Sequence, residues 1–380
     1  MKKQLMFAGA AILLGLLAKQ GCNYQPALAK VEQAMNQGDL SGVLNGVLQG
    51  QQNPNPQTGG VQQAGYTGNQ YPTSGVGQQT TGQYNPTQYT GTNNPPVSPA
   101  TQANPSGTIL IGSFNIQVFG RSKLSSPDVS GILIDIAGRF DVLAIQELRS
   151  TEQDIIPWFV QHLNSRGHNF QYIVGPRQGY TVSKEQYVFL FNANRIRTIA
   201  EPFIAQDPLD KIHRSPMVTR FQTTELPSNE AFTFALMNIH TDPDLVPQEL
   251  SRLEQVIPMV QQTYPDEDDL ILLGDLNAWP EVMSGYKLLP RQGFLIPDAW
   301  ATNTRKDRTY DNIVIDSANT TEFTGQRGVV DLEKLYGLSL DQALEVSDHL
   351  PVWGQFSIRE QRTATAQLPA APVGWNGQSQ

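Results

Sequence analysis

The stretch LILLGDLN, residues 270–277, joins an apolar run to a carboxylate and an amide. Its first four residues have the length and apolar character of a strand that is buried on both faces. Asp275 and Asn277 follow where that strand would end. Loops at strand ends commonly carry the catalytic groups of α/β folds. The stretch therefore predicts a central strand whose end, at the rim of the sheet, carries functional residues.

A second stretch, VSDHLP at residues 346–351, places Asp348 beside His349 just before another strand-like run, VWGQF at 352–356. Two strands of one sheet would deliver these groups and those of 275–277 to the same rim. Asp, Asn and His, with few cysteines to suggest a soft-metal site, suit a hard divalent cation such as Mg²⁺ and phosphate chemistry.

From residue 108 onward, strand and helix patterns alternate along the chain. Strands are predicted at 109–114, 142–145, 170–174, 187–191, 218–221, 232–239, 270–273, 310–315 and 352–358, and helices at 127–140, 152–164 and 247–264. Mixed strands and helices over this length favour a layered α/β domain.

Polar side chains recur where these predicted strands stop. They are Asn115, Glu147, His240, Asp275, Asn277, Asp311, Asp348 and His349. Any one of them alone is most simply a turn residue. Their repetition at successive strand ends indicates one shared site.

Five ordered motifs carry a specific resemblance: SFNI (113–116), IQE (145–147), NIH (238–240), GDLN (274–277) and SDH (347–349). In this order they resemble the endonuclease/exonuclease/phosphatase superfamily. Four further stretches, FNIQVFG (114–120), QELR (146–149), KEQYVFLF (184–191) and LYGLS (335–339), are similar to its deoxyribonuclease I branch. The likeness covers roughly residues 108–357.

The resemblance implies an α/β fold of four layers, in which two facing mixed sheets are flanked by helices. It also implies a metal-dependent phosphodiesterase. Glu147 would hold the divalent metal, with Asn115 and Asp348 nearby. We expect Mg²⁺, with Mn²⁺ or Ca²⁺ as alternatives.

The resemblance also implies a set of catalytic positions. These are His240, His349, Asp275, Asn277, Glu185 and Asp311. Asp275 and Asn277 would position the attacking water and the scissile phosphate. The two histidines would act as acid and base or as phosphate donors, oriented by Glu185 and Asp311 respectively. Phosphodiester hydrolysis needs an in-line water, a charge clamp and a proton for the leaving alkoxide, which two imidazoles and one cation can supply. Which histidine does which task stays open at this point.

Two arginines match positions that contact nucleic acid in the deoxyribonuclease I branch. Arg149 and Arg214 would bind substrate together with Asn115, since Arg is well suited to phosphate and groove contacts. The groove-contacting Tyr of that branch falls on Ser183 here, and Tyr180 lies close by as a substitute. DNA is the expected partner, and the protein is expected to be a monomer.

The formal net charge of −9 does not favour nonspecific DNA affinity, because Lys and Arg (26) are outnumbered by Asp and Glu (35). Binding would therefore depend on the metal and a few arginines. Part of the excess lies in the acidic run at 266–269, which we expect to be a solvated loop before a strand; cation binding there is the alternative. Among the other histidines, we expect His162 and His168 to be surface or capping residues. His213 would either border the substrate groove or occupy an ordinary loop.

The first 106 residues indicate export and a linker. Residues 1–25 read as an export signal or a lipoprotein signal, with Cys22, the only cysteine, as a candidate for lipid attachment and hence for membrane attachment. Residues 26–48 predict a short helix. Residues 49–106 are rich in Gln, Asn, Gly, Pro and Thr and predict a disordered linker. The catalytic domain is expected at 107–360, and a disordered tail at 361–380.

The leading hypothesis is an exported, divalent-metal-dependent endonuclease that hydrolyses DNA with little sequence specificity. Its expected location is periplasmic, extracellular or membrane-anchored. One alternative is a phosphodiesterase acting on lipid head groups or nucleotides, because the metal core would be shared. The other is a tethered envelope protein that keeps the fold without turnover.

Overall fold

The computed structural model describes residues 107–180 and 184–361, which form two facing β-sheets. The six-stranded sheet contains β12 (Phe323–Val329), β13 (Val352–Ser357), β1 (Thr108–Phe119), β2 (Val142–Leu148), β4 (Gln186–Asn192) and β3 (Phe170–Val174), in that order. The seven-stranded sheet contains β10 (Gln292–Phe294), β11 (Asp311–Asp316), β9 (Leu270–Asp275), β8 (Thr233–His240), β7 (Met217–Thr223) and β5 (Ile196–Thr198), with β6 (Phe203–Ile204) paired to β7.

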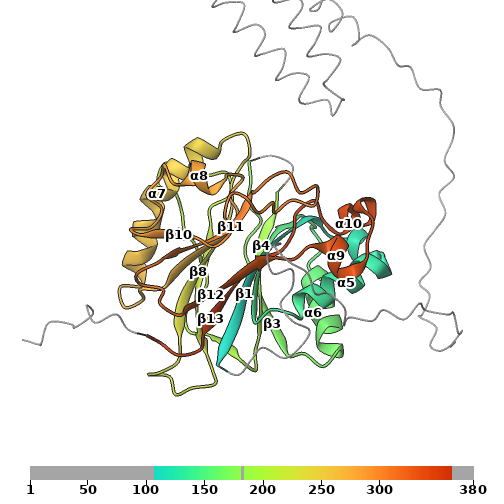
Figure 1. Ribbon diagram of the computed structural model, residues 1–380, viewed down its shortest axis with the longest axis horizontal. Helices are drawn as coiled ribbons and strands as arrows, with labels where there is room; N and C mark the ends of the chain where they lie inside the picture. Colours follow the sequence, from blue (N-terminus) through green and yellow to red (C-terminus); the bar gives the residue numbers. More distant parts are fainter. Residues whose placement is uncertain (1–106, 181–183, 362–380) are drawn as a thin grey trace, which may run out of the picture. The chain divides into compact units, whose positions relative to one another are not determined.

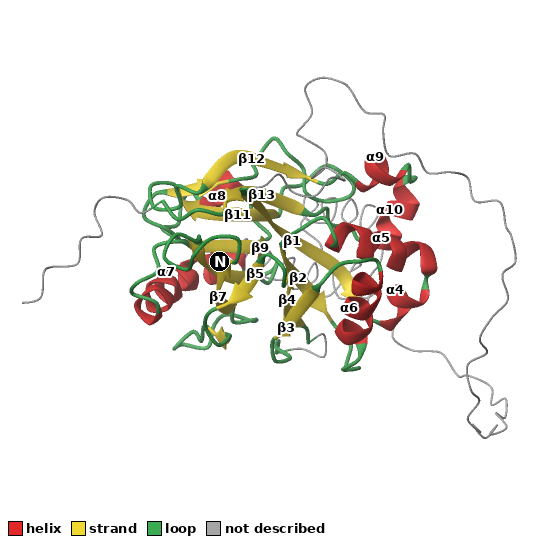
Figure 2. Cartoon of the chain, turned by 90° about the horizontal axis from the view of Figure 1, so that it is seen from below, coloured by secondary structure: helices red, strands yellow, loops and turns green. Residues whose placement is uncertain are grey.

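Helices cover the outer faces of both sheets (Figures 1 and 2). They are α4 (Arg121–Ser125), α5 (Pro127–Ala137), α6 (Ile155–Ser165), α7 (Val246–Thr263), α8 (Pro280–Met283), α9 (Leu332–Tyr336) and α10 (Leu340–Val346). Helices α5, α6, α9 and α10 lie on the side of the six-stranded sheet, and α7 and α8 lie on the side of the seven-stranded sheet. The predicted four-layer α/β sandwich is confirmed.

Strand β8 shows how alternation along a strand builds this sandwich. Phe234 and Leu236 belong to the core between the sheets, whereas Ala235 and Met237 belong to a separate core under α7. Successive side chains of a strand point to opposite faces, so one strand can supply both cores. Because both faces of the strand are covered, it reads as a continuous apolar run.

All twelve predicted elements are present, with ends displaced by a few residues. The largest extension is in β1, which continues to Phe119 rather than ending at Phe114. The sequence analysis missed the short strands β5, β6 and β10, the edge strand β12, and helices α4, α8, α9 and α10. Most of these have two to five residues, and β12 is largely exposed and polar. Elements this short, and a strand this polar, have no periodic pattern of apolar residues from which they could be predicted.

The predicted signal, short helix and linker lie outside the described residues, as does the predicted tail from residue 362 onward. Within the described ranges, no helix combines the length and apolarity needed to cross a membrane.

The acidic run at 266–269 differs from the expectation of a solvated loop. Asp266 is exposed, but Asp269 is 1% exposed and the Glu267 side chain pairs with Arg220 at 3.1 Å. Asp269 is buried because it lies directly before β9, where it shares the inward direction of Ile271 and Leu273. Four successive acidic residues had predicted an exposed loop. The alternation of the following strand explains why Asp269 is buried while Asp266 is exposed.

Candidate active site

Three neighbouring strands of the seven-stranded sheet bring functional side chains side by side. His240 at the end of β8 is in register with Asp275 at the end of β9, through a parallel pairing. Asp311 at the start of β11 is in register with the same Asp275, through an antiparallel pairing. The register therefore delivers all three residues to one rim.

Alternation then directs these side chains into the space between the sheets. In β9, Ile271 and Leu273 belong to the core between the sheets, and Asp275 continues that series. In β11, Ile313 and Ile315 belong to the same core, and Asp311 lies at the start of their series.

Gly274 makes the close approach of β8 and β9 possible. Its φ is +147°, and a Cβ at this position would lie 1.8 Å from the carbonyl oxygen of Ile239. No side chain fits there, so glycine is required immediately before Asp275.

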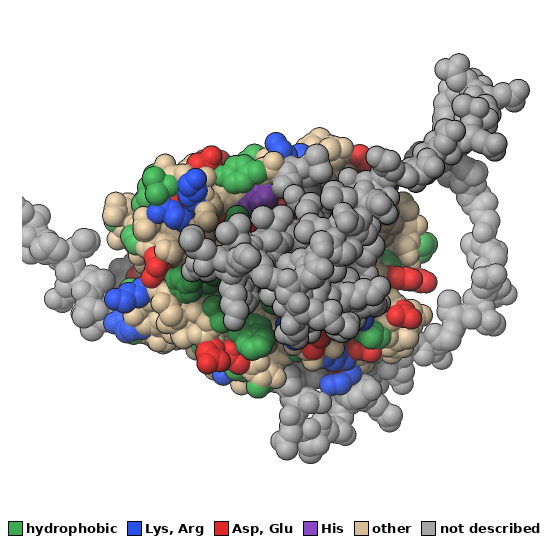
Figure 3. Space-filling view, turned by 90° about the horizontal axis from the view of Figure 1, so that it is seen from above, with side chains coloured by type: hydrophobic (Ala, Val, Ile, Leu, Met, Phe, Trp, Pro, Cys, Tyr) green, Lys and Arg blue, Asp and Glu red, His purple; other side chains and the backbone are tan. Residues whose placement is uncertain are grey.

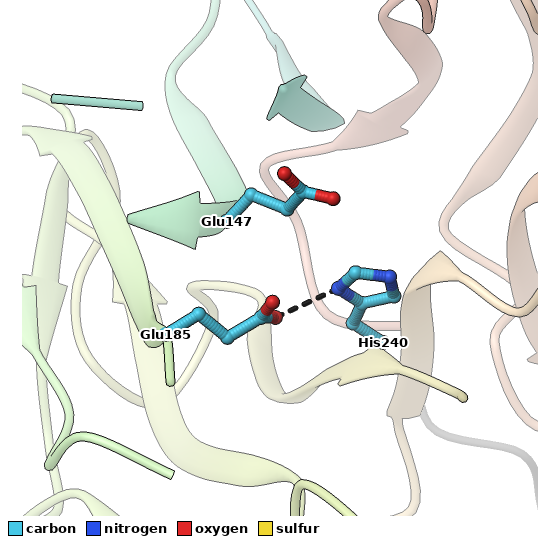
Figure 4. A group of neighbouring side chains, drawn as sticks. All are labelled: Glu147, Glu185 and His240. Atoms are coloured by element: carbon cyan, nitrogen blue, oxygen red, sulfur yellow. Dashed lines mark hydrogen bonds and ion pairs between the residues drawn. The ribbon is translucent and has the colours of Figure 1, made fainter. Parts of the chain in front are cut away.

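The first histidine–carboxylate pair joins the two sheets. His240 Nδ1 lies 2.7 Å from Glu185 Oε1, and Glu185 directly precedes β4 of the opposite sheet. Figure 4 shows this contact, with the Glu147 carboxylate facing the same space. The backbone N–H of His240 donates to the Tyr187 hydroxyl at 2.9 Å. The ring and its backbone are therefore both held, and Nε2 is left to face the centre.

The second pair mirrors the first across the rim. His349 Nδ1 lies 2.8 Å from Asp311 Oδ2. Here the carboxylate comes from the seven-stranded sheet, and the imidazole comes from the segment that precedes β13 of the other sheet. The expectation that two strands of one sheet carry residues 275–277 and 348–349 is therefore wrong, since β9 and β13 belong to different sheets. The Nε2 atoms of His240 and His349 each lie 3.5 Å from Asp275 Oδ2, so both rings converge on one carboxylate.

Burial and charge act in opposite directions on the two imidazoles. Burial lowers the pKa of His240, but the Glu185 and Asp275 carboxylates outweigh it and raise that pKa. For His349, burial again lowers the pKa, and Asp311 and Asp275 raise it well above the usual value. Both rings therefore favour the protonated form.

The carboxylates respond to these rings in different ways. Burial raises the pKa of Asp275, but both nearby histidines outweigh it and the net pKa is lowered. The pKa of Asp311 is raised to about 6, because burial and the neighbouring Asp275 charge outweigh the attraction of His349. Asp275 and Asp311 both face His349, and as the pH falls Asp311 takes up a proton before Asp275 does.

Several acceptor oxygens at this rim fit a hard cation. Asn115 Oδ1, Glu185 Oε2, Asp311 Oδ1 and Asp348 Oδ1 are buried and accept no hydrogen bond from any part of the chain that the structure describes. Buried oxygens without donors are costly unless a cation or water satisfies them. Carboxylate and amide oxygens are the ligands that Mg²⁺ and Ca²⁺ take.

Glu147 is held in an uncommon backbone conformation beside this space. Its φ is +66°, and that of Val118, whose N–H donates to Glu147 Oε2 at 2.7 Å, is +50°. A β-branched residue such as Val rarely adopts positive φ, and such strain gathers at functional sites. Potential ligand atoms of Glu147, Glu185 and His240 lie within 4.8 Å of one another. Glu147 is therefore placed to share a cation with its neighbours.

The two arginines predicted to contact substrate occupy different environments. Arg149 is partly exposed, and its guanidinium lies 2.9 Å from Glu147 Oε1. Arg214 is buried and donates to the backbone carbonyl groups of His240 at 3.1 Å and Thr241 at 2.9 Å. Its side chain thus supports the end of β8, which carries His240, and contact with substrate stays a prediction for both arginines.

Asn115 and Asn277 extend the network around Asp275. Asn115 Nδ2 donates to Asp275 Oδ2 at 2.9 Å, and the Asn277 backbone N–H donates to Asp275 Oδ1 at 3.0 Å. The sequence analysis missed Gln117, which donates to Asp348 Oδ2 at 2.8 Å. Gln117 follows Asn115 by two positions on the same strand, so both side chains are on one face, and this spacing could have identified Gln117 as a site residue.

The remaining histidines have structural contacts. His213 is buried, with Nδ1 2.6 Å from Asp242 Oδ2, and its Nε2 accepts the Tyr180 N–H at 3.0 Å. His162 bonds the Trp158 carbonyl one helical turn back, at 2.8 Å. His168 is half-buried after α6. Of the two alternatives for His213, the structure shows the loop position, in which the buried ring contacts both Asp242 and Tyr180.

The centre carries more acidic side chains than guanidinium groups. The nearby carboxylates of Glu147, Glu185, Asp275, Asp311 and Asp348 outnumber the guanidinium groups of Arg149 and Arg214. On the visible part of the face in Figure 3, Lys and Arg lie scattered among Asp and Glu. A bound phosphate diester would be repelled unless a cation were present.

Fold and site together define an α/β sandwich with an acid–imidazole centre at the rim between its sheets. The family model described as "Endonuclease/Exonuclease/phosphatase family" matches residues 112–349. This chain belongs to that family, which confirms the resemblance found in the sequence.

Relatives with known names match most of their own length. Deoxyribonuclease gamma of Rattus norvegicus is 29% identical over 278 residues, covering 68% of this chain and 87% of the relative. Deoxyribonuclease-1 of Ovis aries is 31% identical over 260 residues, covering 64% and 98%. Among solved structures, the human Nocturnin catalytic domain with bound sulfate is 17% identical with a TM-score of 0.47, covering 66% of this chain and 93% of that chain.

Proposed function

We propose that this protein is an exported, divalent-metal-dependent endonuclease that hydrolyses DNA with little sequence specificity. The observation that carries the proposal is the convergence of two histidine–carboxylate pairs on Asp275, each with Nε2 at 3.5 Å. The named relatives, which are deoxyribonucleases, support DNA as the substrate. Export rests on the apolar N-terminal stretch after Lys2 and Lys3.

The geometry supports hydrolysis by paired acid–base groups. A water attacks phosphorus in line and loses a proton, and the leaving alkoxide oxygen gains one. Neutral His240 or His349 accepts the first proton at Nε2, and the other ring, as imidazolium, donates the second. Glu185 and Asp311 accept hydrogen bonds from Nδ1 and so keep each Nε2 directed at the centre.

Asp275 and Asn277 are proposed to hold the water and the scissile phosphate. Asp275 faces both rings, and Asn277 Nδ2 is engaged with the Thr241 carbonyl at 3.0 Å, which fixes the side chain near the rim. Glu147, Asn115 and Asp348 would hold Mg²⁺, or Mn²⁺ or Ca²⁺. When bound, this cation supplies charge neutralisation for the phosphoryl oxygens.

The direct test is incubation of the purified full chain with supercoiled plasmid DNA. The arms contain Mg²⁺, Mg²⁺ with excess chelator, and Mg²⁺ with the His349→Ala variant. Nicking that requires Mg²⁺ and is lost in the variant is expected. A folded protein that leaves the plasmid intact but cleaves a phospholipid head group or a nucleotide diester would replace this proposal. Absence of turnover with every divalent cation would favour a binding role.

A further inference from the structure

A second group of carboxylates lies at the opposite rim of the sandwich. Asp269 directly precedes β9, whereas the catalytic Asp275 ends that strand. Six residues of strand separate the two, or roughly 20 Å at about 3.3 Å per residue. Glu322 directly precedes β12, and Glu360 follows β13. The cluster is therefore distinct from the catalytic centre.

These three carboxylates come from both sheets. Asp269 belongs to the end of the seven-stranded sheet, and Glu322 and Glu360 belong to the end of the six-stranded sheet. One oxygen of each lies within 4.8 Å of the others. Asp269 and Glu322 are each only 1% exposed. The residues are 53 and 38 positions apart along the chain (322 minus 269 and 360 minus 322), so only the facing of the two sheets brings them together.

Bases within the described chain do not neutralise the buried pair. Neither Asp269 nor Glu322 forms an ion pair with a Lys or Arg of the described ranges. Arg220 is engaged by Glu267, and Arg359 pairs with Glu230. Burial and the Glu322 charge raise the pKa of Asp269 to about 10. Ionised, Asp269 and Glu322 therefore need a positive charge from elsewhere.

Unsatisfied oxygens point to a ligand rather than to a closed network. Asp269 Oδ1, Glu322 Oε2 and the Thr320 hydroxyl are buried and lack a hydrogen-bond partner among the described residues. Thr320 is 3% exposed, and its hydroxyl lies near enough to Asp269 to lower the pKa of that carboxyl by a polar contact, although the two groups do not have the geometry of a hydrogen bond. Thr320 is uncharged, so its orphaned oxygen is an observation independent of the acidic cluster. Buried polar atoms of this kind ordinarily have a partner.

We propose that Asp269, Glu322 and Glu360, with the Thr320 hydroxyl, form a Ca²⁺ site that ties the two sheets together at the rim opposite the catalytic centre. Oxygen ligands from separate, irregular segments suit Ca²⁺, which takes 6–8 ligands in flexible geometry, better than Mg²⁺, which demands a near-ideal octahedron. The site contributes stability by binding the folded state alone.

The test follows the melting temperature of the full chain during titration with calcium chloride. The Glu147→Gln substitution is present throughout, so that a cation at the catalytic rim contributes little. We expect Ca²⁺ at about 100 times its Kd to raise the melting temperature by roughly 5–10 °C. Asp269→Asn and, separately, Glu322→Gln should abolish this rise. The matched control Asp266→Asn, an exposed carboxylate of the same run, should keep it.

Two further readouts separate a cation site from a shared proton. Without Ca²⁺, the parent should lose stability as the pH rises toward 10, because the raised pKa keeps the Asp269 carboxyl protonated at lower pH and folding then resists its ionisation. Asp269→Asn should lose less stability over the same pH range. Calorimetric titration should show one fewer Ca²⁺ bound in Asp269→Asn than in the parent. A parent protein without a Ca²⁺-dependent rise, or an Asp269→Asn variant that keeps the full rise, overturns the proposal. Plasmid cleavage is not needed, so failure here leaves the nuclease proposal untouched.

Discussion

The two histidine–carboxylate pairs have the same geometry but different surroundings. Each joins the two sheets, with Nδ1–oxygen distances of 2.7 Å for His240 and 2.8 Å for His349. The first pair has a cation beside it, since Arg214 lies 3.5 Å from Glu185. Near the second ring, Asp275, Asp311 and Asp348 are all acidic.

This difference separates the proton affinities of two otherwise similar rings. Arg214 lowers the pKa of His240, whereas Asp348 adds to the effects that raise the pKa of His349. We therefore expect His349 to hold its proton to higher pH than His240. In a pair of acid and base, the environment rather than the residue type then assigns the roles.

Removal of either ring should have the largest effect. His240→Ala and His349→Ala should each lower kcat by about 10²–10⁴-fold, the usual contribution of a positioned acid or base. The double variant should be little worse than the poorer single variant, because the rings act as a unit. Plasmid-nicking rates measure this, with His168→Ala as the control. Additive losses would mean that the two rings work independently.

Removal of the orienting carboxylates should have a smaller effect. Glu185→Gln and Asp311→Asn should each lower kcat by roughly 10²-fold, because Nδ1 loses its charged acceptor.

The pH–rate profile of kcat/KM should also change in these variants. Loss of a carboxylate lowers the pKa of its histidine, so the limb that reports that ring moves to lower pH. The shift should be larger for Glu185→Gln, because only Asp275 then opposes Arg214 at His240, whereas Asp275 and Asp348 both still raise the pKa of His349 in Asp311→Asn. Equal shifts in the two variants would contradict the difference between the pairs.

Substitution of the arginines should have the smallest effects and should differ in kind. Arg214→Met should lower kcat by about tenfold, because the end of β8 that carries His240 loses two hydrogen bonds, with little change in salt dependence. Arg149→Met should raise KM and reduce the slope of log affinity against log salt by about 1, as expected for one lost phosphate contact. Binding and rate measurements at several salt concentrations distinguish them. The same salt slope for Arg149→Met and the parent protein would remove Arg149 from the DNA interface.

The sequence analysis predicted the layered α/β class and the rim of the site for a definite reason. Apolar runs such as 270–273 end in polar residues, and strand ends are where α/β folds commonly place catalytic groups. His240, Asp275 and Asp311 could be grouped in this way before their register was known. The burial of Arg214 could not be predicted in the same way, because a charged residue between His213 and Ser215 belongs to no periodic apolar pattern.

By itself, the sequence determined the family, nine of the thirteen strands in the described residues and the residue types at the rim, because motif order and apolar strand runs are local properties. The tertiary structure alone decided which residues meet. Glu185 reaches His240, and Asp269 reaches Glu322, only because the two sheets face each other. The same facing buries Asp269 away from water, and buried like charges acquire proton and cation affinities that no local pattern encodes.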